Sequence, residues 1–525
     1  MLRGLSTVLL RVRAPGRRLG SGSPGGRDRW SPPRRRLVAL GGALGLAAAL
    51  AWVAGAEDEG ESQPRAPKGG FSRAVQRSRD LLQRVKDEAG APGIVIGVSV
   101  DGKDVWLEGL GYADVENRVP CKPETVLRIA SISKALTMTA ALKLWEEGKL
   151  DLDAPVQKYV PEFPEKEFEG KKVAITARLL ASHLSGIRHY EKDIAKVKEE
   201  KEKFNRALRS EIESIKMDLR EKDKGSDKSD EAKAKSEAEA KNAKGRKKKK
   251  EFEQEEYYLK EKIEDVIESL NLFKNDPLFF KPGSQFLYST HGFTLLSAVV
   301  ERASGHKFTD YMLKLFLDLD MLATGLDDNE SLIYNRARYY ILNKKSRLVN
   351  APYVDNSYKW AGGGFVSTVG DLLKFGNSML YGYQLEQLKS LAPGLLPGYL
   401  KPSTIAMMWT VVPNTEVSWR REGHYGMAWH IVEKKQECGF CRQQRHYATH
   451  SGGAIGASSV LLILPEDENT EAIKDDPLMP PRGVVVSIIC NMQSVSLHST
   501  ALNIAMEFEK DKLADSAYKS NSLLD

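Results

Sequence analysis

A serine and a lysine three positions apart, Ser131 and Lys134, are the residues of this chain whose types and spacing best suit covalent chemistry. An extended run at 125–129 ends just before Ser131, and apolar residues at helical spacing follow from Ile132. Free N–H groups and a positive dipole end surround the first residues of a helix, and Lys134 would share a face with Ser131 one turn on. Burial lowers the pKa of a lysine, so a neutral amine there could take the hydroxyl proton. The pair is a candidate nucleophile and base.

The spacing by itself is weak evidence, because the same Ser-x-x-Lys pattern occurs at Ser304–Lys307 and at Ser516–Lys519. The first of these follows a predicted helix end at Gly305, and the second lies in a polar stretch near the C-terminus. A surface serine beside a solvated lysine is the ordinary explanation of such a pair. Only Ser131 has a strand before it, a helix after it and apolar residues on both sides.

The positive charge of the chain is gathered in two places. The net charge is +7, with ten arginines in residues 1–36 and a lysine-rich run at 246–250, and the remainder is nearly balanced. This distribution does not favour a nucleic-acid partner. A hydrophobic content of 41% over 525 residues is enough for a large core. Four cysteines in this length do not indicate a disulfide framework.

The N-terminal residues have the composition of a targeting segment. Residues 1–36 are rich in arginine and contain one acidic residue, which is typical of a mitochondrial transit segment. Residues 37–56 are uncharged and apolar, as in a membrane or sorting segment, and acidic residues begin a linker at 57–70. Basic residues before and acidic residues after the apolar run predict a mitochondrial protein, with the intermembrane space favoured over the matrix. A secretory signal or a type II anchor is the alternative.

A highly charged insertion interrupts the body at 191–254. Of the 70 residues at 191–260, 41 are charged, 22 of them basic and 19 acidic, so this stretch has too little apolar surface to offset the entropy of ordering. Its first part has helical spacing to about Arg220, and 226–250 has a disordered composition. We expect homo-oligomers, with higher-order assembly through this insertion, and contact of its basic run with an anionic membrane. A nuclear signal is the alternative for that run.

Hydrophobic periodicity in the rest of the chain predicts an α+β fold. Helical spacing at 71–89 precedes two β runs at 93–100 and 106–113, which a hairpin turn at Asp101-Gly102 would join. Strands near the C-terminus would close the same antiparallel sheet, and the middle of the chain would form a helical subdomain across a cleft. The other predicted elements are helices at 175–187, 257–272, 372–380 and 497–510, strands at 425–429, 458–464 and 484–489, and a tail at 511–525.

Three further polar residues lie at predicted turns or helix ends. Tyr288 follows a Pro-Gly turn and precedes a helix, where it could reach a cleft, although a core aromatic is the ordinary interpretation. His183 is predicted to hydrogen-bond a loop near the site rather than to do chemistry. Asp371 is predicted to cap the helix at 372–380, with the orientation of a neighbouring group as the alternative.

A Cys-x-x-Cys pair, Cys438 and Cys441, precedes His446 and His450. The gap to the histidines is too short for a common zinc finger, and the chain has no second pair of this kind. A disulfide at a hairpin tip or two free thiols is the favoured interpretation over a zinc site.

Three segments together resemble the serine β-lactamase and penicillin-binding-protein family. They are Ser131-x-x-Lys134, Tyr288-Ser289-Thr290 and His450-Ser451-Gly452, in the order in which the class C branch carries its motifs. The resemblance covers roughly 71–190 and 255–510, and it is nearest to mitochondrial β-lactamase-like members in animals. It implies a catalytic domain with an antiparallel sheet flanked by helices, in which 191–254 is an insertion.

The resemblance also implies roles for the matching residues. Ser131 would be the acylated nucleophile, and Lys134 would take or relay its proton. Tyr288 would activate water or protonate the leaving group, if nearby cations stabilise its phenolate. His450 would supply a pH-dependent charge. The amide of Ser131 and an amide on the strand that follows His450, in the Ser451-Gly452 region, would form the oxyanion hole. No cofactor and no metal ion are implied.

Two departures from the family pattern change the expected substrate. Thr290 stands where relatives have an asparagine that donates to the acyl-side amide, and His450 stands where many have a lysine. No glutamate for deacylation is recognisable by motif. We therefore expect poor β-lactam hydrolysis and favour a peptidase that acts through an acyl-enzyme on a peptide or ester substrate. A carboxylesterase and a self-associating scaffold on the same fold are the alternatives.

Overall fold

The computed structural model describes residues 71–196, 199, 202, 206, 255–387, 397–416, 423–435, 444–466 and 481–522. The predicted transit segment, the apolar segment at 37–56, the linker, most of the charged insertion and the Cys438–Cys441 pair lie outside these residues. The chain from Arg65 onward forms one unit. Within the described parts no helix combines the length and the apolar character that crossing a bilayer requires.

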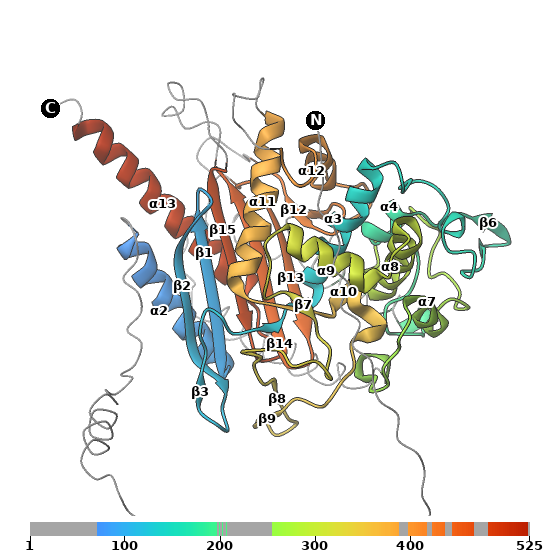
Figure 1. Cartoon of the computed structure of the whole chain (residues 1–525), viewed down its shortest axis with the longest axis horizontal. Helices are drawn as coiled ribbons and strands as arrows, with labels where there is room; N and C mark the ends of the chain where they lie inside the picture. Colours follow the sequence, from blue (N-terminus) through green and yellow to red (C-terminus); the bar gives the residue numbers. More distant parts are fainter. Residues whose placement is uncertain are drawn as a thin grey trace, which may run out of the picture. The chain divides into compact units, whose positions relative to one another are not determined.

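The first half of the described chain alternates short strands with helices, and the colours of Figure 1 follow the sequence from blue to yellow-green through them. Its elements are α2 (Ser72–Ala89), β1 (Gly93–Val100), β2 (Lys103–Asp114), β3 (Val119–Pro120), β4 (Leu127–Arg128), α3 (Ser133–Glu146), β5 (Lys166–Phe168), β6 (Lys171–Val173), α4 (Ala177–Ala181), α7 (Val266–Ser269), α8 (Thr290–Ser304) and α9 (Phe308–Asp318).

The second half supplies most of the sheet and the last helices. Its elements are β7 (Gly325–Leu326), β8 (Tyr340–Leu342), β9 (Leu348–Asn350), α10 (Trp360–Gly363), β10 (Phe365–Ser367), α11 (Val369–Gln387), α12 (Pro402–Met408), β11 (His424–Tyr425), β12 (His430–Val432), β13 (Tyr447–Ala454), β14 (Ala457–Pro465), β15 (Gly483–Cys490) and α13 (His498–Ser522).

One antiparallel sheet of eight strands organises the fold, in the order β11-β12-β13-β14-β15-β1-β2-β3. The predicted hairpin is confirmed: β1 pairs with β2 through a turn in which Asp101 and Gly102 both have positive φ. The predicted closure is confirmed as well, because β15 pairs with β1 from Val100↔Val484 to Ile94↔Cys490. The two ends of the chain therefore build one sheet, as the α+β prediction requires.

Helices cover both faces of this sheet, which explains why β1, β14 and β15 are buried along their whole length. Figure 1 shows α2 and α13 on one face and α11 on the other, with the remaining helices beyond α11. One apolar cluster lies between the sheet and the α2–α13 pair, and a larger cluster joins α11 to α3, α8 and α10. The strands can be rich in valine and isoleucine because neither face contacts water.

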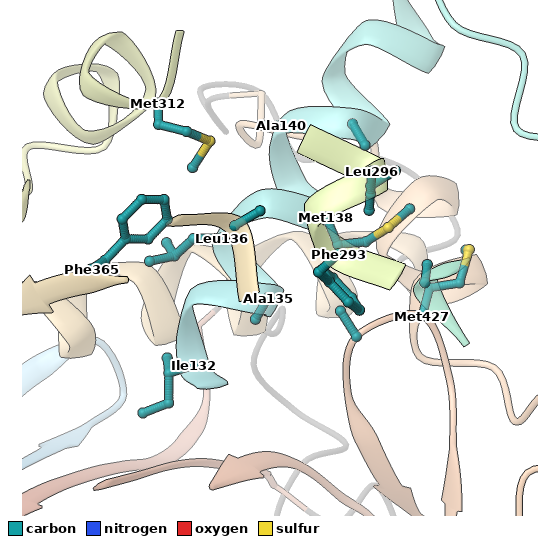
Figure 2. Close-up of a cluster of buried hydrophobic side chains, with 14 of the residues drawn as sticks. Ile132, Ala135, Leu136, Met138, Ala140, Phe293, Leu296, Met312, Phe365 and Met427 are labelled. Atoms are coloured by element: carbon teal, nitrogen blue, oxygen red, sulfur yellow. The ribbon is translucent and has the colours of Figure 1, made fainter. Parts of the chain in front are cut away.

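Helix α3 lies inside the larger cluster and not on its surface. The apolar residues at helical spacing are buried as predicted, but so is every other residue from Ser133 to Leu142, so the helix is enclosed on all sides. Figure 2 shows Leu136 beside Phe365, and Met138 beside Phe293 of α8. A helix held in this way gives the residues at its start a fixed position.

The last helix is longer than predicted. It runs to Ser522 instead of ending near Lys510, so it includes most of the predicted tail. The extension is polar but partnered: Asp511 accepts a hydrogen bond from the amide of Ala74 at 2.9 Å, and Lys512 bonds Asp101 at 2.6 Å. Apolar periodicity could not reveal these contacts, because they join residues more than 400 positions apart.

Three predicted elements differ from the structure in type or extent. Residues 257–272 are not one helix: η4 (Glu255–Tyr258), α7 and η5 (Leu270–Leu272) are short turns, and between them Ile263 donates its amide to the side chain of Ser357. The helix predicted at 175–187 is only α4. Of the strand predicted at 425–429 only Tyr425 lies in a strand, at the end of β11; the other residues form a bend before β12, where Ala428 has φ 62°.

The role predicted for Asp371 is also wrong in part. Thr368 precedes α11 and its hydroxyl accepts from the amide of Asp371, as an N-cap does. The carboxylate of Asp371 instead accepts from the amide of Ala323 at 2.8 Å and from the hydroxyl of Thr324 at 2.9 Å. Asp371 therefore orients a neighbouring loop, which was the alternative.

Candidate active site

Ser131 lies in a single 3₁₀ turn, Ala130–Ile132, between β4 and α3. The prediction of a strand before it and a helix after it is confirmed, although the strand has only two residues and α3 begins at Ser133. Ala130 has φ 49°, a left-handed conformation that costs a non-glycine residue energy. Ser459 of β14 donates to the carbonyl oxygen of Ile129 at 2.7 Å and ties this turn to the sheet. The junction is therefore fixed from both sides.

Lys134 lies directly behind Ser131 in the protein interior. Its Nζ is 3.1 Å from Ser131 Oγ and 3.5 Å from Thr290 Oγ1, and it donates to the carbonyl oxygen of Gly362. The side chain has no exposed surface. Burial, and then the charge of Lys359, hold the pKa of Lys134 well below 10.5. The expected neutral amine therefore lies within hydrogen-bonding distance of the expected nucleophile.

Tyr288 completes this group from the loop before α8. Its ring lies over Lys134, with Nζ 4.8 Å from the ring centroid, and its phenol is hydrogen-bonded to Ser131. Burial raises the pKa of Tyr288 above the ordinary value of 10, and the hydrogen bond to Ser131 only partly offsets this. Because the phenol keeps its proton at neutral pH, Tyr288 is better suited to donate a proton than to accept one.

His450 lies on β13, but both nitrogens of its ring are engaged inside the protein. Nδ1 lies 2.8 Å from the carbonyl oxygen of Ser451, and Nε2 lies 2.8 Å from the hydroxyl of Tyr425. A carbonyl oxygen only accepts, so Nδ1 donates to it. His450 borders the cavity at Ser131, and these two bonds fix the orientation of its ring.

The end of β13 presents a free edge beside Ser131. The pairing of β12 with β13 stops at Thr449, whereas β13 stays paired with β14 to Ala454. Among the strands that the structure describes, none pairs with the other edge beyond Thr449. In an antiparallel strand alternate residues direct their N–H and C=O groups to each side, so this edge has groups available for a ligand.

A cavity of about 480 Å³ brings the predicted site residues together. Ser131, Tyr288, His450 and Ser451 line it. Gly452 does not: a Cβ added there would lie 2.4 Å from the carbonyl oxygen of Ile129 and 2.2 Å from the hydroxyl of Ser459. Gly452 therefore lets β13 pack closely against the turn that carries Ser131, while its neighbours face the cavity.

The sequence did not point to Lys359, whose side chain also lines the cavity. Its Nζ lies 4.7 Å from the ring centroid of Tyr257 and 5.0 Å from that of Tyr358. Burial lowers the pKa of Lys359 to about 7. No acidic residue lines the cavity within the described ranges. A position just before a glycine run was the one available signal, and it does not distinguish a cavity lysine from a surface lysine.

Two histidines support the loop that carries Tyr288. Nδ1 of His183 accepts from the amide of Ser289 at 3.1 Å, which confirms that His183 bonds a loop near the site. Nδ1 of His189 accepts from the amide of Thr290 at 3.2 Å. His189 follows the predicted helix at 175–187 and carries no motif of its own, so no pattern in the sequence singles it out.

The described residues contain no group of three or more histidine, cysteine, aspartate or glutamate side chains placed to hold a metal ion. Two cysteines that the structure describes, Cys121 and Cys490, are buried free thiols. Burial raises the pKa of each of these thiols to about 12, so neither is a ready nucleophile.

The chain matches the family model described as Beta-lactamase over residues 78–221 and 232–505. It is 69% identical over 451 residues to a Mus musculus protein named "Serine beta-lactamase-like protein LACTB, mitochondrial", a match that covers 84% of this chain and 82% of that relative. Its fold is similar to that of an octameric penicillin-binding protein homologue from Pyrococcus abyssi, with 24% identity, a TM-score of 0.55 and coverage of 84% of this chain and 77% of that one.

A second solved structure has the same fold. It is a class C β-lactamase mutant with 15% identity and a TM-score of 0.54, and the match covers 84% of this chain and 98% of that one. The predicted β-lactamase and transpeptidase-like architecture is therefore confirmed.

Proposed function

Because the chain belongs to the Beta-lactamase family, we propose that it is a mitochondrial serine hydrolase that cleaves peptides through an acyl-enzyme on Ser131. One observation carries the proposal: Lys134 Nζ is buried 3.1 Å from Ser131 Oγ, in surroundings that hold its pKa well below the ordinary value. A neutral amine at that distance is the base that a serine nucleophile needs. The close likeness to β-lactamase-like relatives supports the hydrolase class.

The arrangement of the side chains suggests the order of proton transfers. Ser131 Oγ attacks the carbonyl carbon of the substrate while Lys134 takes the hydroxyl proton. Amide groups of Ser131 and Gly453, which both border the cavity, would hold the developing oxyanion. Tyr288 gives its proton to the leaving nitrogen, and the proton on Lys134 restores the phenol. In deacylation a water molecule takes the place of the leaving group and gives a proton to Lys134, from which Ser131 recovers one.

The free edge of β13 supports a peptide as the substrate. An extended peptide can add to such an edge by backbone hydrogen bonds, and the edge begins at Ser451, next to the nucleophile. β-Lactams are expected to be poor substrates. Thr290 lacks an amide donor, and the ring of His450 is already held by Tyr425 and by the carbonyl oxygen of Ser451.

Peptide-library profiling of the wild type and Ser131→Ala tests this function. We expect the wild type to cleave a subset of peptides and the variant to cleave none. Cleavage that persists in Ser131→Ala would exclude Ser131 as the nucleophile. Turnover of simple esters by the wild type without cleavage of any peptide would favour a carboxylesterase.

For the location, we propose the intermembrane space of the mitochondrion. The name of the Mus musculus relative includes the word mitochondrial, and basic residues precede while acidic residues follow the apolar run at 37–56. Protease treatment of mitoplasts provides the test. The protein should be degraded once the outer membrane is opened, and protection until the inner membrane is lysed would place it in the matrix.

A scaffold role is the second candidate, and we propose self-association through the charged insertion as its basis. A buried ion pair joins the residues that flank the insertion: Arg188 lies just before it, Glu256 lies just after it, and their side chains are 2.8 Å apart. Segments on the two sides of the insertion are thus fixed to the body close to one another. Deletion of 200–250 keeps this pair, and it should reduce the particle size measured by light scattering. An unchanged size would exclude assembly through the insertion.

A further inference from the structure

Two histidines perform the same task on successive residues at the start of α8. The first amides of a helix have no partner inside the helix. His183 accepts from the amide of Ser289 and His189 accepts from the amide of Thr290, each through Nδ1. As supports for the helix start the two rings are equivalent, so any further role must arise from what their second nitrogens face.

The second nitrogens lie in different surroundings. His183 is 1% exposed, its Nε2 is buried and has no hydrogen-bond partner within the described chain, and its ring packs against Tyr288 and Phe293. His189 is only half-buried and lines the cavity together with Ser131. Within the described residues the one hydrogen bond of the His189 ring is the bond at Nδ1. Its Nε2 is therefore open to a ligand.

The bond at Nδ1 determines where the ring proton of His189 lies. A nitrogen that accepts an N–H carries no proton, so the neutral ring has its proton on Nε2. Burial, and then the neighbouring His291, hold the pKa of His189 well below 6.5. At neutral pH the ring thus presents a fixed Nε2–H donor to the cavity.

Thr290 cannot fill the role of an amide donor on this wall. Its side chain is 4% exposed, with Oγ1 3.5 Å from Lys134 Nζ and a hydrogen bond to Tyr190. Thr290 borders the cavity, but its hydroxyl is already engaged by Tyr190 and lies close to Lys134, and its side chain carries no amide N–H.

We propose that His189 is a substrate-binding residue whose Nε2–H donates to the carbonyl oxygen of the substrate's acyl-side amide. The inference rests on the proposed function, because it needs a substrate acylating Ser131. It assigns substrate recognition to a loop histidine at the edge of the charged insertion, outside the three segments that carry the catalytic groups.

Two activated esters of equal length test the assignment. The p-nitrophenyl ester of N-acetylglycine carries an acyl-side amide, and p-nitrophenyl pentanoate has methylene groups in its place. The ratio of their kcat/KM values measures how much binding of the acyl-side amide contributes, because changes at the nucleophile affect both esters alike. We expect the wild type to prefer the acetylglycyl ester. A wild type that hydrolyses both esters without preference would overturn the proposal.

Four variants separate donation to substrate from support of the helix. His189→Asp keeps an acceptor for the amide of Thr290 but has no donor, and the ratio should fall about tenfold, the worth of one hydrogen bond. His189→Asn keeps both an acceptor for the amide of Thr290 and an N–H donor for the substrate, and its ratio should stay within about threefold of the wild-type ratio. His183→Asn changes the matched residue and should leave the ratio unchanged. If His189→Asp does not fold, as judged by its melting curve, His189→Met removes the donor without adding charge and should show the same fall.

Labelling of Ser131 by a small fluorophosphonate, which has no acyl-side amide, separates this inference from the proposed function. His189→Asp, or His189→Met where it replaces that variant, could still be labelled and still hydrolyse the pentanoate ester with an unchanged ester ratio. That result would show that His189 only supports the helix. An equal fall of the ratio in His183→Asn would show that the effect passes through α8. A wild type that neither labels nor hydrolyses either ester would contradict the proposed function itself.

Discussion

The chain contains two described Ser-x-x-Lys pairs, Ser131–Lys134 and Ser304–Lys307, in opposite surroundings. Ser304 ends α8, and its hydroxyl bonds the carbonyl oxygen of Glu301 at 3.1 Å. Gly305 then ends the helix in the left-handed conformation, and Lys307 is exposed. Ser131 instead precedes a helix, and Lys134 has no exposed surface. The same three-residue spacing thus produces a solvated helix end in one place and, in the other, a buried pair that we propose to be a nucleophile and its base.

The difference indicates that the surroundings of such a pair, and not its spacing, decide whether the lysine can act as a base. A lysine in water keeps its proton and cannot act as a base at neutral pH. We expect the opposite of Lys134, because α3 lies inside the core and burial holds the pKa of its amine well below the ordinary value. A buried amine costs stability, and the bond to the carbonyl oxygen of Gly362 satisfies part of its hydrogen-bonding capacity.

The largest expected effect comes from removing each serine in turn. Ser131→Ala should abolish labelling by a fluorophosphonate and reduce hydrolysis by about 10⁴-fold or more. Ser304→Ala should leave both unchanged, because Ser304 is bonded only to the end of its own helix and the residues after it. Gel fluorescence measures the labelling, and initial rates measure the hydrolysis. Equal labelling of both variants would mean that a different residue is the nucleophile.

Replacing each lysine by methionine comes next in size. Lys134→Met should slow acylation by about 10³-fold, since general-base catalysis is typically worth about 10²–10⁴-fold. Lys307→Met serves as the matched control and should react at the wild-type rate. Stopped-flow acylation with p-nitrophenyl pentanoate gives the rates. If Lys134→Met acylates at the wild-type rate, a group other than this amine takes the proton.

The comparison also explains which parts of the site could be predicted from sequence. Ser131, Lys134, Tyr288 and His450 could be proposed as site residues because each lies in a short linear pattern, and the hairpin of β1 and β2 could be predicted because its alternation and turn are local. Lys359 reaches the cavity from a segment more than 200 residues after Ser131. Its position depends on how α10 packs, which no local pattern records.

The wrong predictions have the same cause. Local spacing at 257–272 is helical, but side chains such as Ser357 bond the backbone there and hold it in short turns. Asp371 lies where a helix cap is expected, yet Thr368 caps α11 and the carboxylate serves a distant loop. Long-range hydrogen bonds thus override local preference near the site.

Tyr288 distinguishes the two pairs further, because the structure places no such ring beside Lys307 in its described surroundings. Tyr288→Phe removes the proton donor for the leaving group and should slow cleavage of a peptide amide by about 10²-fold. Hydrolysis of a p-nitrophenyl ester should change less than about threefold, because p-nitrophenolate leaves without a proton. Parallel assays on one peptide and one ester measure this. An equal loss on both substrates would assign Tyr288 to acylation in general.

The smallest expected effect concerns the charge that helps to keep Lys134 neutral. Lys359 lowers the pKa of Lys134, so Lys359→Met should raise that pKa and reduce the fraction of neutral amine at acidic pH. The pKa of Lys359 is itself about 7, so its charge is present below pH 7 and largely lost above it. The rate should therefore fall about threefold to tenfold near pH 6 and stay unchanged near pH 9.

A matched control shows whether this shift comes from charge at the site. Lys166 is also a buried lysine with a lowered pKa, but it bonds the carbonyl oxygens of Lys274 and Asp276 and does not line the cavity. Lys166→Met should leave the pH profile of acylation unchanged. If the rate of Lys359→Met at acidic pH also equals that of the wild type, burial alone keeps Lys134 neutral. The contrast with the solvated Lys307 would then depend on packing without help from a neighbouring charge.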